Sequence, residues 1–421
     1  MLRLFYFEIR KNYFRKFVII AFSLFLIINV LLIYKNYING NSESTGYFMP
    51  HSVSTEKSWE FYRSMHKKLD GALTVDKADF IIHENNRLKS IVSDGTYSKE
   101  YQPDSYTGYL WGDYVMVNKY FYNPMKYIST YSINIDKIVK KAKDNIAFYE
   151  KYGNGYEKAK NEFIADHYSE RKITVFYDSK PWELLFDYNF SDLLILLLML
   201  LGLVPMFINE KETKMSSLIL ASKNGKINMT IIKIMSAFAF VSFLVLVFSC
   251  ENMLAFNFLY GLNGHAMPLY AMEGYQYSPL TCSILAFYFL IVLLKIIGFL
   301  SFGMFIFLLS SLLSRVIYTY MLSSLLLIGG IYASGYMVSV ELKKVLLSFF
   351  SPFTLLKGNE LYSELLDTNI FSKFFLIPNI CILLQMITIS ILFLFICKTT
   401  SFKPLKTAQV LLERGELSND I

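Results

Sequence analysis

The stretch "LLILLLMLLGLVPMFINEKETKMSSLILASKNGKINMTIIK", residues 193–233, decides the fold class because it joins two apolar runs through a short charged piece. Residues 193–208 contain no charged side chain, whereas residues 209–228 alternate charges with short apolar clusters. A long apolar run is typical of a membrane-spanning helix, since hydrocarbon offers no partner for unpaired backbone groups. The stretch therefore predicts two crossings joined by a water-facing loop.

The whole chain has the same apolar character. Of its 421 residues 54% are hydrophobic and only 18% are charged, which is too apolar for a soluble domain of this length. We expect an α-helical polytopic membrane protein, with a mainly helical (α+β) extracytoplasmic domain inserted after the first span. Six transmembrane helices are predicted, at residues 17–34, 193–208 (extended outward past Asp192), 229–250, within 281–313, 316–340 and 374–397.

The fourth span is the least regular, because its apolar run is too long for one crossing and Lys295 interrupts it. One interpretation is an interfacial or re-entrant piece before Lys295, followed by the crossing itself. A lysine at mid-membrane costs roughly 2.5–3.5 kcal/mol, which makes Lys295 an intramembrane functional candidate. The alternative is that its amine snorkels to the outer interface. Glu251 and Glu341, at the outer ends of spans three and five, are its candidate partners.

Glycines and prolines mark special positions in three other spans. Gly329 and Gly330 predict a close helix contact in span five, since they carry no side chain. Pro205 and Pro378 predict kinks in spans two and six. The first span is not expected to be a cleaved leader, because no small-residue cleavage pattern follows it.

Lysines and arginines flanking the spans predict the orientation. They gather in residues 1–16, 209–233 and 398–414, whereas the insert at 35–190 is neutral overall. We therefore expect both termini in the cytosol: a cytosolic amphipathic elbow helix at 1–16, span one at 17–34, the extracytoplasmic domain at 35–190, and spans two to six within 191–421. The net charge of +7 then meets anionic membrane lipid and is not a nucleic-acid footprint.

The insert shows no pattern of a catalytic or metal site. Helices are predicted at 54–65, 75–92, 135–152 and 156–168, a strand at 172–178, and a tyrosine-rich core piece at 101–131. The string "HENNR" at 83–87 lacks the second histidine that a zinc helix needs, and no nucleophile motif appears. The four cysteines lie in or beside spans, which predicts a domain without disulfides. We expect a non-catalytic chain that holds no metal or cofactor.

The charged piece at 209–228 is not a phosphate-binding loop. A P-loop needs a glycine at 220 and a hydroxyl at 227, and these positions hold Leu220 and Ile227. Its apolar residues recur at helical spacing instead, with Glu210 and Glu212 at the N-terminal side, where carboxylates suit the helix dipole. Asn224-Gly225 suits the C-terminal stop of a short amphipathic helix.

This piece resembles the cytosolic loop of type-2 ABC exporter permeases. "EKE" (210–212), "LILAS" (218–222), "GK" (225–226) and Lys233 occupy matching positions, and the departures fall at Lys214-Met215 and Lys223. "FEIRKNYFRK" (7–16) is similar to the elbow helix of that family, and "SPFTLL" (351–356) to its Pro-Phe segment. One branch of the family carries a large outer domain between spans one and two.

The resemblance implies a coupling helix that docks on a separate ATPase subunit, which would bind the ATP and magnesium. It also implies a homodimer, or a heterodimer with a related permease, embedded in membrane lipid. The implied substrate is amphipathic or hydrophobic, such as a peptide, an antimicrobial compound or a lipid-like molecule. The residues that this assigns to ATPase coupling are Glu210, Lys211, Glu212, Met215, Leu218, Ile219, Gly225 and Lys226.

Other functions remain open at this point. Within the same family the cargo could be sodium or another small ion. Outside it, the chain could be a secondary transporter, although several mid-membrane acids and internal repeats are usual there. A membrane-anchored sensor is the third alternative, although no cytosolic segment is long enough for a signalling domain.

Overall fold

The computed structural model of the chain describes residues 2–39, 55–93, 105, 110–213, 227–336 and 347–413. Six described stretches are long and apolar enough to cross a membrane, which confirms the predicted number of apolar spans. They are Lys16–Tyr37, Lys180–Glu212, Ile227–Tyr260, Ile284–Leu312, Val316–Ser334 and Ile377–Thr400.

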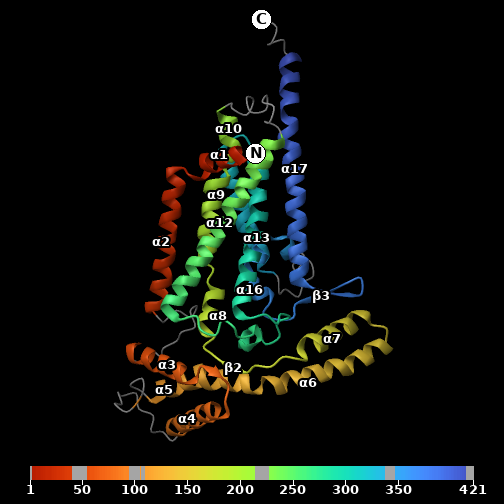
Figure 1. The fold of residues 1–421 in the computed structure, drawn as a ribbon. Helices are drawn as coiled ribbons and strands as arrows, with labels where there is room; N and C mark the ends of the chain where they lie inside the picture. Colours follow the sequence, from red (N-terminus) through yellow and green to blue (C-terminus); the bar gives the residue numbers. More distant parts are fainter. Residues whose placement is uncertain are drawn as a thin grey trace.

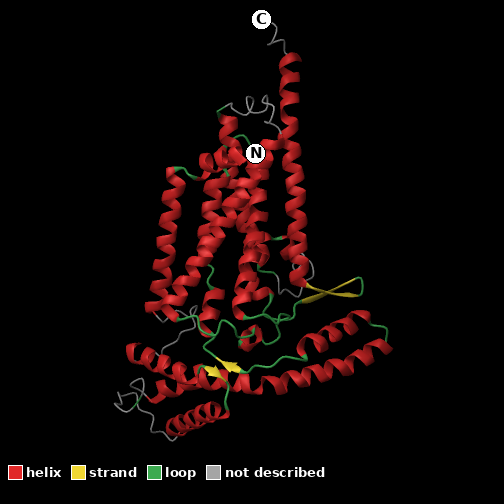
Figure 2. Cartoon of the chain, in the orientation of Figure 1, coloured by secondary structure: helices red, strands yellow, loops and turns green. Residues whose placement is uncertain are grey.

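The apolar helices stand side by side as a bundle, and a layer of further helices crosses one end of it (Figures 1 and 2). We call this the layered end, and the opposite end, where the N-terminus and α10 lie, the terminal end (Figure 1). The helices of the bundle and its terminal end are α1 (Leu2–Tyr13), α2 (Lys16–Asn39), α8 (Lys180–Asp187), α9 (Phe190–Leu203), α10 (Pro205–Glu212), α12 (Ile227–Tyr260), α13 (Ile284–Leu312), α14 (Val316–Ser334) and α17 (Ile377–Glu413).

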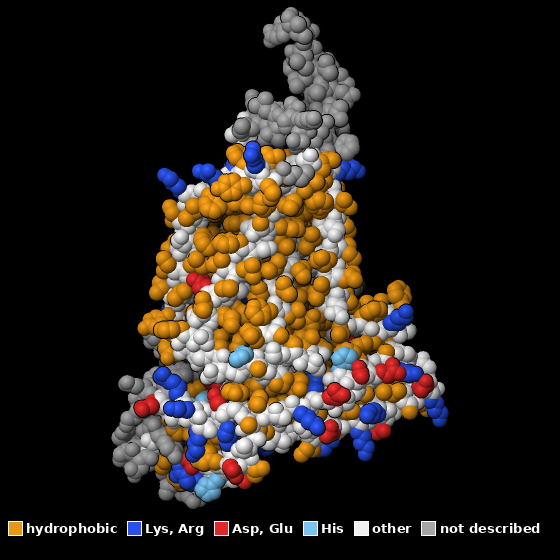
Figure 3. Space-filling model, in the orientation of Figure 1, with side chains coloured by type: hydrophobic (Ala, Val, Ile, Leu, Met, Phe, Trp, Pro, Cys, Tyr) orange, Lys and Arg blue, Asp and Glu red, His pale blue; other side chains and the backbone are white. Residues whose placement is uncertain are grey.

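The second apolar stretch is the centre of the bundle. In its most apolar window 78% of the residues are buried, against 17% for α2 and for α14. The lipid-facing side of a peripheral helix needs no protein partner, whereas a central helix is covered by protein on all sides. On the face drawn in Figure 3, hydrophobic side chains cover the bundle, and charged ones gather over the layered end.

The Pro-Phe segment packs between two apolar helices. It forms a 3-10 helix, η4 (Pro352–Lys357), followed by the short α16 (Gly358–Leu361). A Cβ on Gly330 of α14 would lie 2.5 Å from the Phe353 ring, so only glycine fits there, whereas a Cβ on Gly329 would meet nothing within 4 Å. Ser351 Oγ also donates to the Gly330 carbonyl over 2.7 Å. The predicted close approach therefore occurs at Gly330, against η4.

Three spans differ from their predicted limits, and the third of the six continues to Tyr260 instead of residue 250. The fifth ends at Ser334 instead of residue 340. The described residues stop two positions later, at residue 336. The sixth starts at Ile377, because residues 373–376 pair in a hairpin of β3 (Asp367–Ile370) and β4 (Lys373–Leu376). Pro378 therefore lies in the first turn of α17, where a missing N–H costs nothing, and the predicted kink is wrong.

The layered end is built mainly from helices, near the predicted positions. Its helices are α3 (Thr55–Leu69), α4 (Val75–Ser93), α5 (Leu110–Val117), the π-helix η1 (Asn118–Tyr122), α6 (Asn123–Lys151) and α7 (Gly155–Tyr168). The strand predicted over 172–178 is limited to β2 (Val175–Phe176), which pairs antiparallel with β1 (Gly71–Ala72). The hairpin is tied to α7, since Asp367 pairs with Lys160 at 2.9 Å and accepts a hydrogen bond from Tyr156.

The layer is fastened to the bundle through the loop at residues 261–283, which contains η2 (Leu269–Ala271) and η3 (Glu273–Tyr275). Tyr127 Oη donates to the Tyr270 carbonyl and Tyr168 Oη to the Tyr277 carbonyl, each over 2.7 Å. Arg171 Nη2 donates to the Ser278 carbonyl over 2.7 Å. These hydrogen bonds satisfy backbone carbonyls of the loop, which would otherwise lack the partners that a helix or a sheet provides.

Candidate functional site

The central helix breaks at Pro205, and a hydroxyl from α13 fills the break. Proline has no N–H to continue the helical ladder, so α9 ends at Leu203 and α10 begins at Pro205. Ser310 Oγ donates to the Val204 carbonyl over 3.0 Å and accepts from the Phe207 N–H over 3.4 Å. The helix is interrupted at the proline, as predicted, and α10 leads along the chain into the charged segment at residues 214–226.

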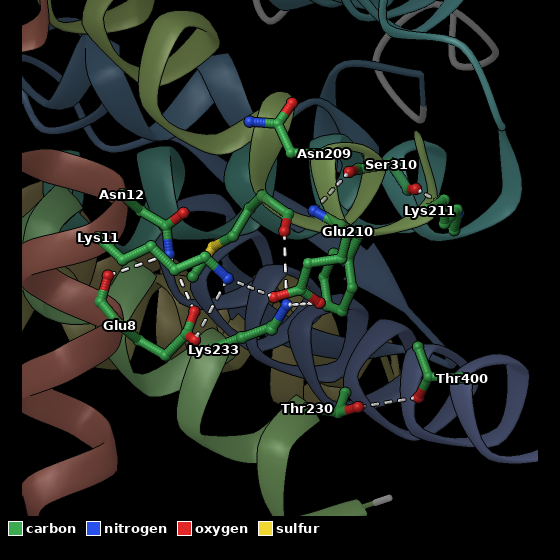
Figure 4. Close-up of polar contacts among 12 residues, drawn as sticks. Glu8, Lys11, Asn12, Asn209, Glu210, Lys211, Thr230, Lys233, Ser310 and Thr400 are labelled. Carbon is green, nitrogen blue, oxygen red and sulfur yellow. Dashed lines mark hydrogen bonds and ion pairs between the residues drawn. The ribbon is translucent and has the colours of Figure 1, made fainter. Parts of the chain in front are cut away.

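Glu210, in the last turn of α10, is the centre of a buried ion-pair cluster (Figure 4). Its carboxylate accepts from Lys11 Nζ of α1 over 2.6 Å and pairs on its other oxygen with Lys233 Nζ of α12. The side chain of Lys233 is only 2% exposed and that of Glu210 9%. Three helices are thus joined through one carboxylate.

A second carboxylate balances the charge of this cluster. Glu8 is fully buried on α1, and one of its oxygens lies 3.8 Å from Lys11 Nζ. The other accepts from Asn12 Nδ2 over 2.9 Å. Lys233 also faces the Met206 carbonyl at 3.4 Å and the Phe207 ring. Two carboxylates and two ammonium groups therefore lie together, as burial of charge requires.

Lys211 connects α10 to the end of α13. Its ammonium donates to the carbonyls of Ser310, Ser311 and Leu313 over 2.7 to 2.8 Å. These carbonyls end a helix and have no intrahelical donor, and a cation there also meets the negative end of the helix dipole. Lys211 therefore caps the C-terminus of α13, and these hydrogen bonds are made within the chain.

Hydroxyl pairs extend these links to α17. Thr230 Oγ1 of α12 donates to Thr400 Oγ1 over 3.0 Å, and Ser311 of α13 lies 3.4 Å from the Thr399 hydroxyl. Five helices, α1, α10, α12, α13 and α17, thus meet within the terminal end.

Of the eight residues assigned to ATPase coupling, three lie in the described part of the chain. Glu210 and Lys211 are engaged inside the bundle, and Glu212 is exposed. Met215, Leu218, Ile219, Gly225 and Lys226 lie outside the described residues.

The helix position expected for the two glutamates is wrong. They were expected at the N-terminal side of a separate helix, but they lie in the last turn of α10, which continues the second span. A carboxylate is unfavourable at that end of a helix. For Glu210 the two lysines offset this cost, and Glu212 is exposed.

Lys295 pairs with Asp192 of α9, whose Oδ1 lies 2.9 Å from its amine. Both side chains are about nine-tenths buried, so the lysine does not snorkel to an interface. Neither candidate partner contacts it: Glu251 accepts instead from Asn29 over 2.8 Å, and Glu341 lies outside the described residues. The break expected at Lys295 is also wrong, because α13 runs uninterrupted through it and the carboxylate stabilises the amine in place.

A polar network beside this pair was missed from the sequence. Asn29 of α2 donates to Asn252 Oδ1 as well as to Glu251, each over 2.8 Å. Asn252 donates to Ser191 Oγ over 2.9 Å, and Tyr188 Oη donates to Asn29 Oδ1 over 2.9 Å. In the sequence the available sign was a single asparagine inside an apolar run, and the structure shows that this side chain is fully buried.

The chemistry open to these groups is mainly that of holding helices in register. Among the residues that the structure describes, no group of three or more His, Cys, Asp or Glu side chains is placed to hold a metal ion. The ion pairs of Glu210 with Lys11 and Lys233, and of Asp192 with Lys295, connect different helices. Pairs of this kind resist sliding of one helix past another, because each shift would leave a charge unpaired.

Comparison with known proteins adds no family to this description. No protein-family model matches the chain, and no curated protein is similar to it.

Proposed function

We propose that this chain is the permease subunit of an ATP-driven exporter of the ABC type. A separate ATPase subunit binds at the terminal end, which lies in the cytosol, and residues 35–190 lie outside the cell. The observation that supports this most is the Glu210 cluster. It joins the helix that leads into residues 214–226 to α1 and α12.

The proposed mechanism is mechanical. A push on residues 214–226 would reach α10, and α10 is tied to α13 by Lys211 and to α1 and α12 by Glu210. Packed helices joined by ion pairs move as rigid bodies, so a small displacement becomes a rearrangement of the spans. The functional unit is a dimer of this chain or a pair with a related permease, and the cargo is an amphipathic or hydrophobic molecule.

The first experiment tests the orientation. Glu212→Cys and Tyr152→Cys, both at exposed positions, are treated with a membrane-impermeant maleimide in intact and in permeabilised cells. Glu212→Cys should react only after permeabilisation and Tyr152→Cys in intact cells, with the wild-type chain as the control for its own cysteines. Labelling of Glu212→Cys in intact cells would contradict the proposal.

The second experiment tests the energy source. The tagged full chain, isolated from its native membranes in nanodiscs, should carry an ATP-hydrolysing subunit. Glu210→Gln should lower the ATP hydrolysis of the assembled complex, because the variant weakens the link between α10 and its neighbours. Lys35→Gln, at the layered end of α2, is the matched control and should leave the ATP hydrolysis unchanged. The absence of any co-purifying ATPase would overturn the proposal.

One observation favours a second candidate, an ion-coupled secondary transporter. Asp192 and Glu251 place two carboxylates within the apolar stretches, close to Asn29, Asn252 and Lys295. Acids at such positions are typical of ion and proton pathways. Substrate movement in vesicles on an ion gradient alone, without any ATPase, would favour this candidate over the exporter.

A further inference from the structure

An apolar groove of about 510 Å³ lies near the terminal end, between α1, α2 and α12. Its volume falls in the range of roughly 300–1,000 Å³ that is usual for small-molecule sites. Tyr13 closes it from α1, Val18 and Phe22 line it from α2, and Phe240 and Phe243 line it from α12.

The inner wall of the groove is fixed. Tyr13 stacks on Phe240 with ring centroids 4.0 Å apart, and Tyr13 Oη donates to Met206 Sδ over 3.5 Å. Phe240 lies so close to α9 that a Cβ on Gly202 would be 2.8 Å from its ring. Burial raises the pKa of the Tyr13 phenol above its usual range, which keeps this wall uncharged.

The outer side of the groove is open. Phe14 is 66% exposed, Phe243 53% and Ile19 44%, and all three lie along its rim. The lining is apolar apart from the Ser23 and Tyr13 hydroxyls, so water has little to bind there. Because α2 and α12 are two of the six apolar spans, this opening faces the hydrocarbon of a bilayer.

Two cations lie where the groove meets the end of α2. Lys16 and Ile19 are three residues apart, so they share a helix face, one turn from each other. Arg15 is oriented by its bonds to the Lys11 carbonyl, at 3.0 Å, and to Asn12 Oδ1, at 3.2 Å. Within the described part of the chain, neither Arg15 nor Lys16 forms an ion pair with a carboxylate.

We propose that this groove binds one acyl chain of an anionic glycerophospholipid, whose phosphate lies against Arg15 and Lys16. The acyl chain matches the apolar lining and the lateral opening, and the anionic headgroup matches the two cations one helical turn away. A neutral lipid would fill the groove without using these cations. The proposal requires the apolar helices to lie in a membrane, and it does not depend on the exporter function.

The bound lipid would hold α1 against α12. Tyr13 of the groove wall and Lys11 of the Glu210 cluster lie on the same short helix, half a turn apart. An acyl chain packed against Tyr13 and Phe240 therefore stabilises the position from which Lys11 reaches Glu210. The lipid would thus be a structural partner of the ion-pair cluster.

The headgroup is tested with the full chain, equilibrated with vesicles of phosphatidylcholine and phosphatidylglycerol that carry identical acyl chains. The lipid retained after mild detergent extraction is counted by native mass spectrometry. The wild-type chain should retain phosphatidylglycerol preferentially, and Lys16→Ala should reduce that preference about fivefold, the effect expected of one basic residue at a lipid surface. Lys35→Ala, at the other end of the same helix, is the control and should not. Equal retention of both lipids by the wild-type chain, or equal effects of the two variants, would overturn the proposal.

The groove is tested by filling it. Ala239→Trp, in the lining of α12, should abolish retention of both lipids, whereas Leu246→Trp, on an exposed face of the same helix outside the groove, should leave it unchanged. Size-exclusion profiles establish that both variants are folded. If Ala239→Trp proves misfolded, Lys16→Glu carries the test alone and should remove the preference for phosphatidylglycerol while retaining phosphatidylcholine. Retention that Ala239→Trp and Leu246→Trp affect equally would indicate general annular lipid and would contradict the proposal.

Discussion

At the terminal end of the bundle, the central contact is a cluster of ion pairs between side chains, whereas at the layered end the helices are fastened to the 261–283 loop by side chains that donate to backbone carbonyls. Glu210 with Lys11 and Lys233 represents the first kind, and Tyr127, Tyr168 and Arg171 the second. An ion pair depends on both partners, so one substitution leaves a buried charge unpaired. The layered end instead spreads its contacts over many bonds, each of modest energy. The terminal end is therefore the more sensitive of the two to a single change.

The largest effect is expected from Glu210→Gln. This change leaves the ammonium of Lys233, 2% exposed, without its carboxylate, and breaking a buried pair costs about 3–5 kcal/mol. The measurement is the free energy of unfolding in detergent. Glu212→Gln, two residues along and exposed, is the matched control and should change it by less than about 0.5 kcal/mol.

A double variant separates lost charge from lost shape in this cluster. Glu210→Gln combined with Lys233→Met removes both charges at similar volume, and it should recover most of the lost stability. If Glu210→Gln proved no more costly than Glu212→Gln, the contrast between the two ends would fail.

A smaller loss is expected from Arg171→Met at the layered end. Arg171 is 3% exposed and donates to the Ser278 and Leu280 carbonyls over 2.7 and 3.4 Å, and its guanidinium lies 4.0 Å from the Tyr168 ring centroid. Hydrogen bonds of a charged donor contribute about 1.5–3 kcal/mol, so the variant should lose roughly that amount. Hydrogen exchange should show the loss first in the 261–283 loop. A loss as large as that of Glu210→Gln would contradict the idea that the layered end spreads its stability over many modest contacts.

The smallest effect at neutral pH is expected for Tyr168, whose contribution to stability depends on pH. Burial raises the pKa of Tyr168 from 10.0 to about 12, with the nearby Arg171 opposing the shift. The unfolded chain therefore ionises first, so the contribution of this phenol is complete below pH 10 and is lost between pH 10 and 12.

The measurement is the unfolding free energy of the wild type and of Tyr168→Phe from pH 7 to 12. The variant should show a shallower decline above pH 10, because it has one phenol fewer to ionise. Tyr152→Phe, at a position 68% exposed, should decline as the wild type does. A wild-type decline that begins below pH 9 would indicate that other groups control this end.

The apolar spans could be predicted from the sequence to within a few residues at most of their ends, because length and hydrophobicity are local properties. The candidate site could be predicted only in part. Glu210 was assigned a role through the resemblance of its loop and Lys295 through its charge inside an apolar run, but partners of these residues lie at Lys11 and Asp192, 199 and 103 residues away. The role of Asn29 could not be predicted, because a single amide in an apolar run gives no periodic signal.

The amino-acid sequence by itself determined the helical class, the number of apolar stretches and the helical nature of the insert at residues 35–190. Only the tertiary structure decided that α13 continues through Lys295, that β3 and β4 move the start of the last span to Ile377, and that Glu210 joins three helices. The physical reason is that a span depends on its own side chains and the surrounding hydrocarbon, whereas a buried charge is stabilised by whichever helix becomes its neighbour.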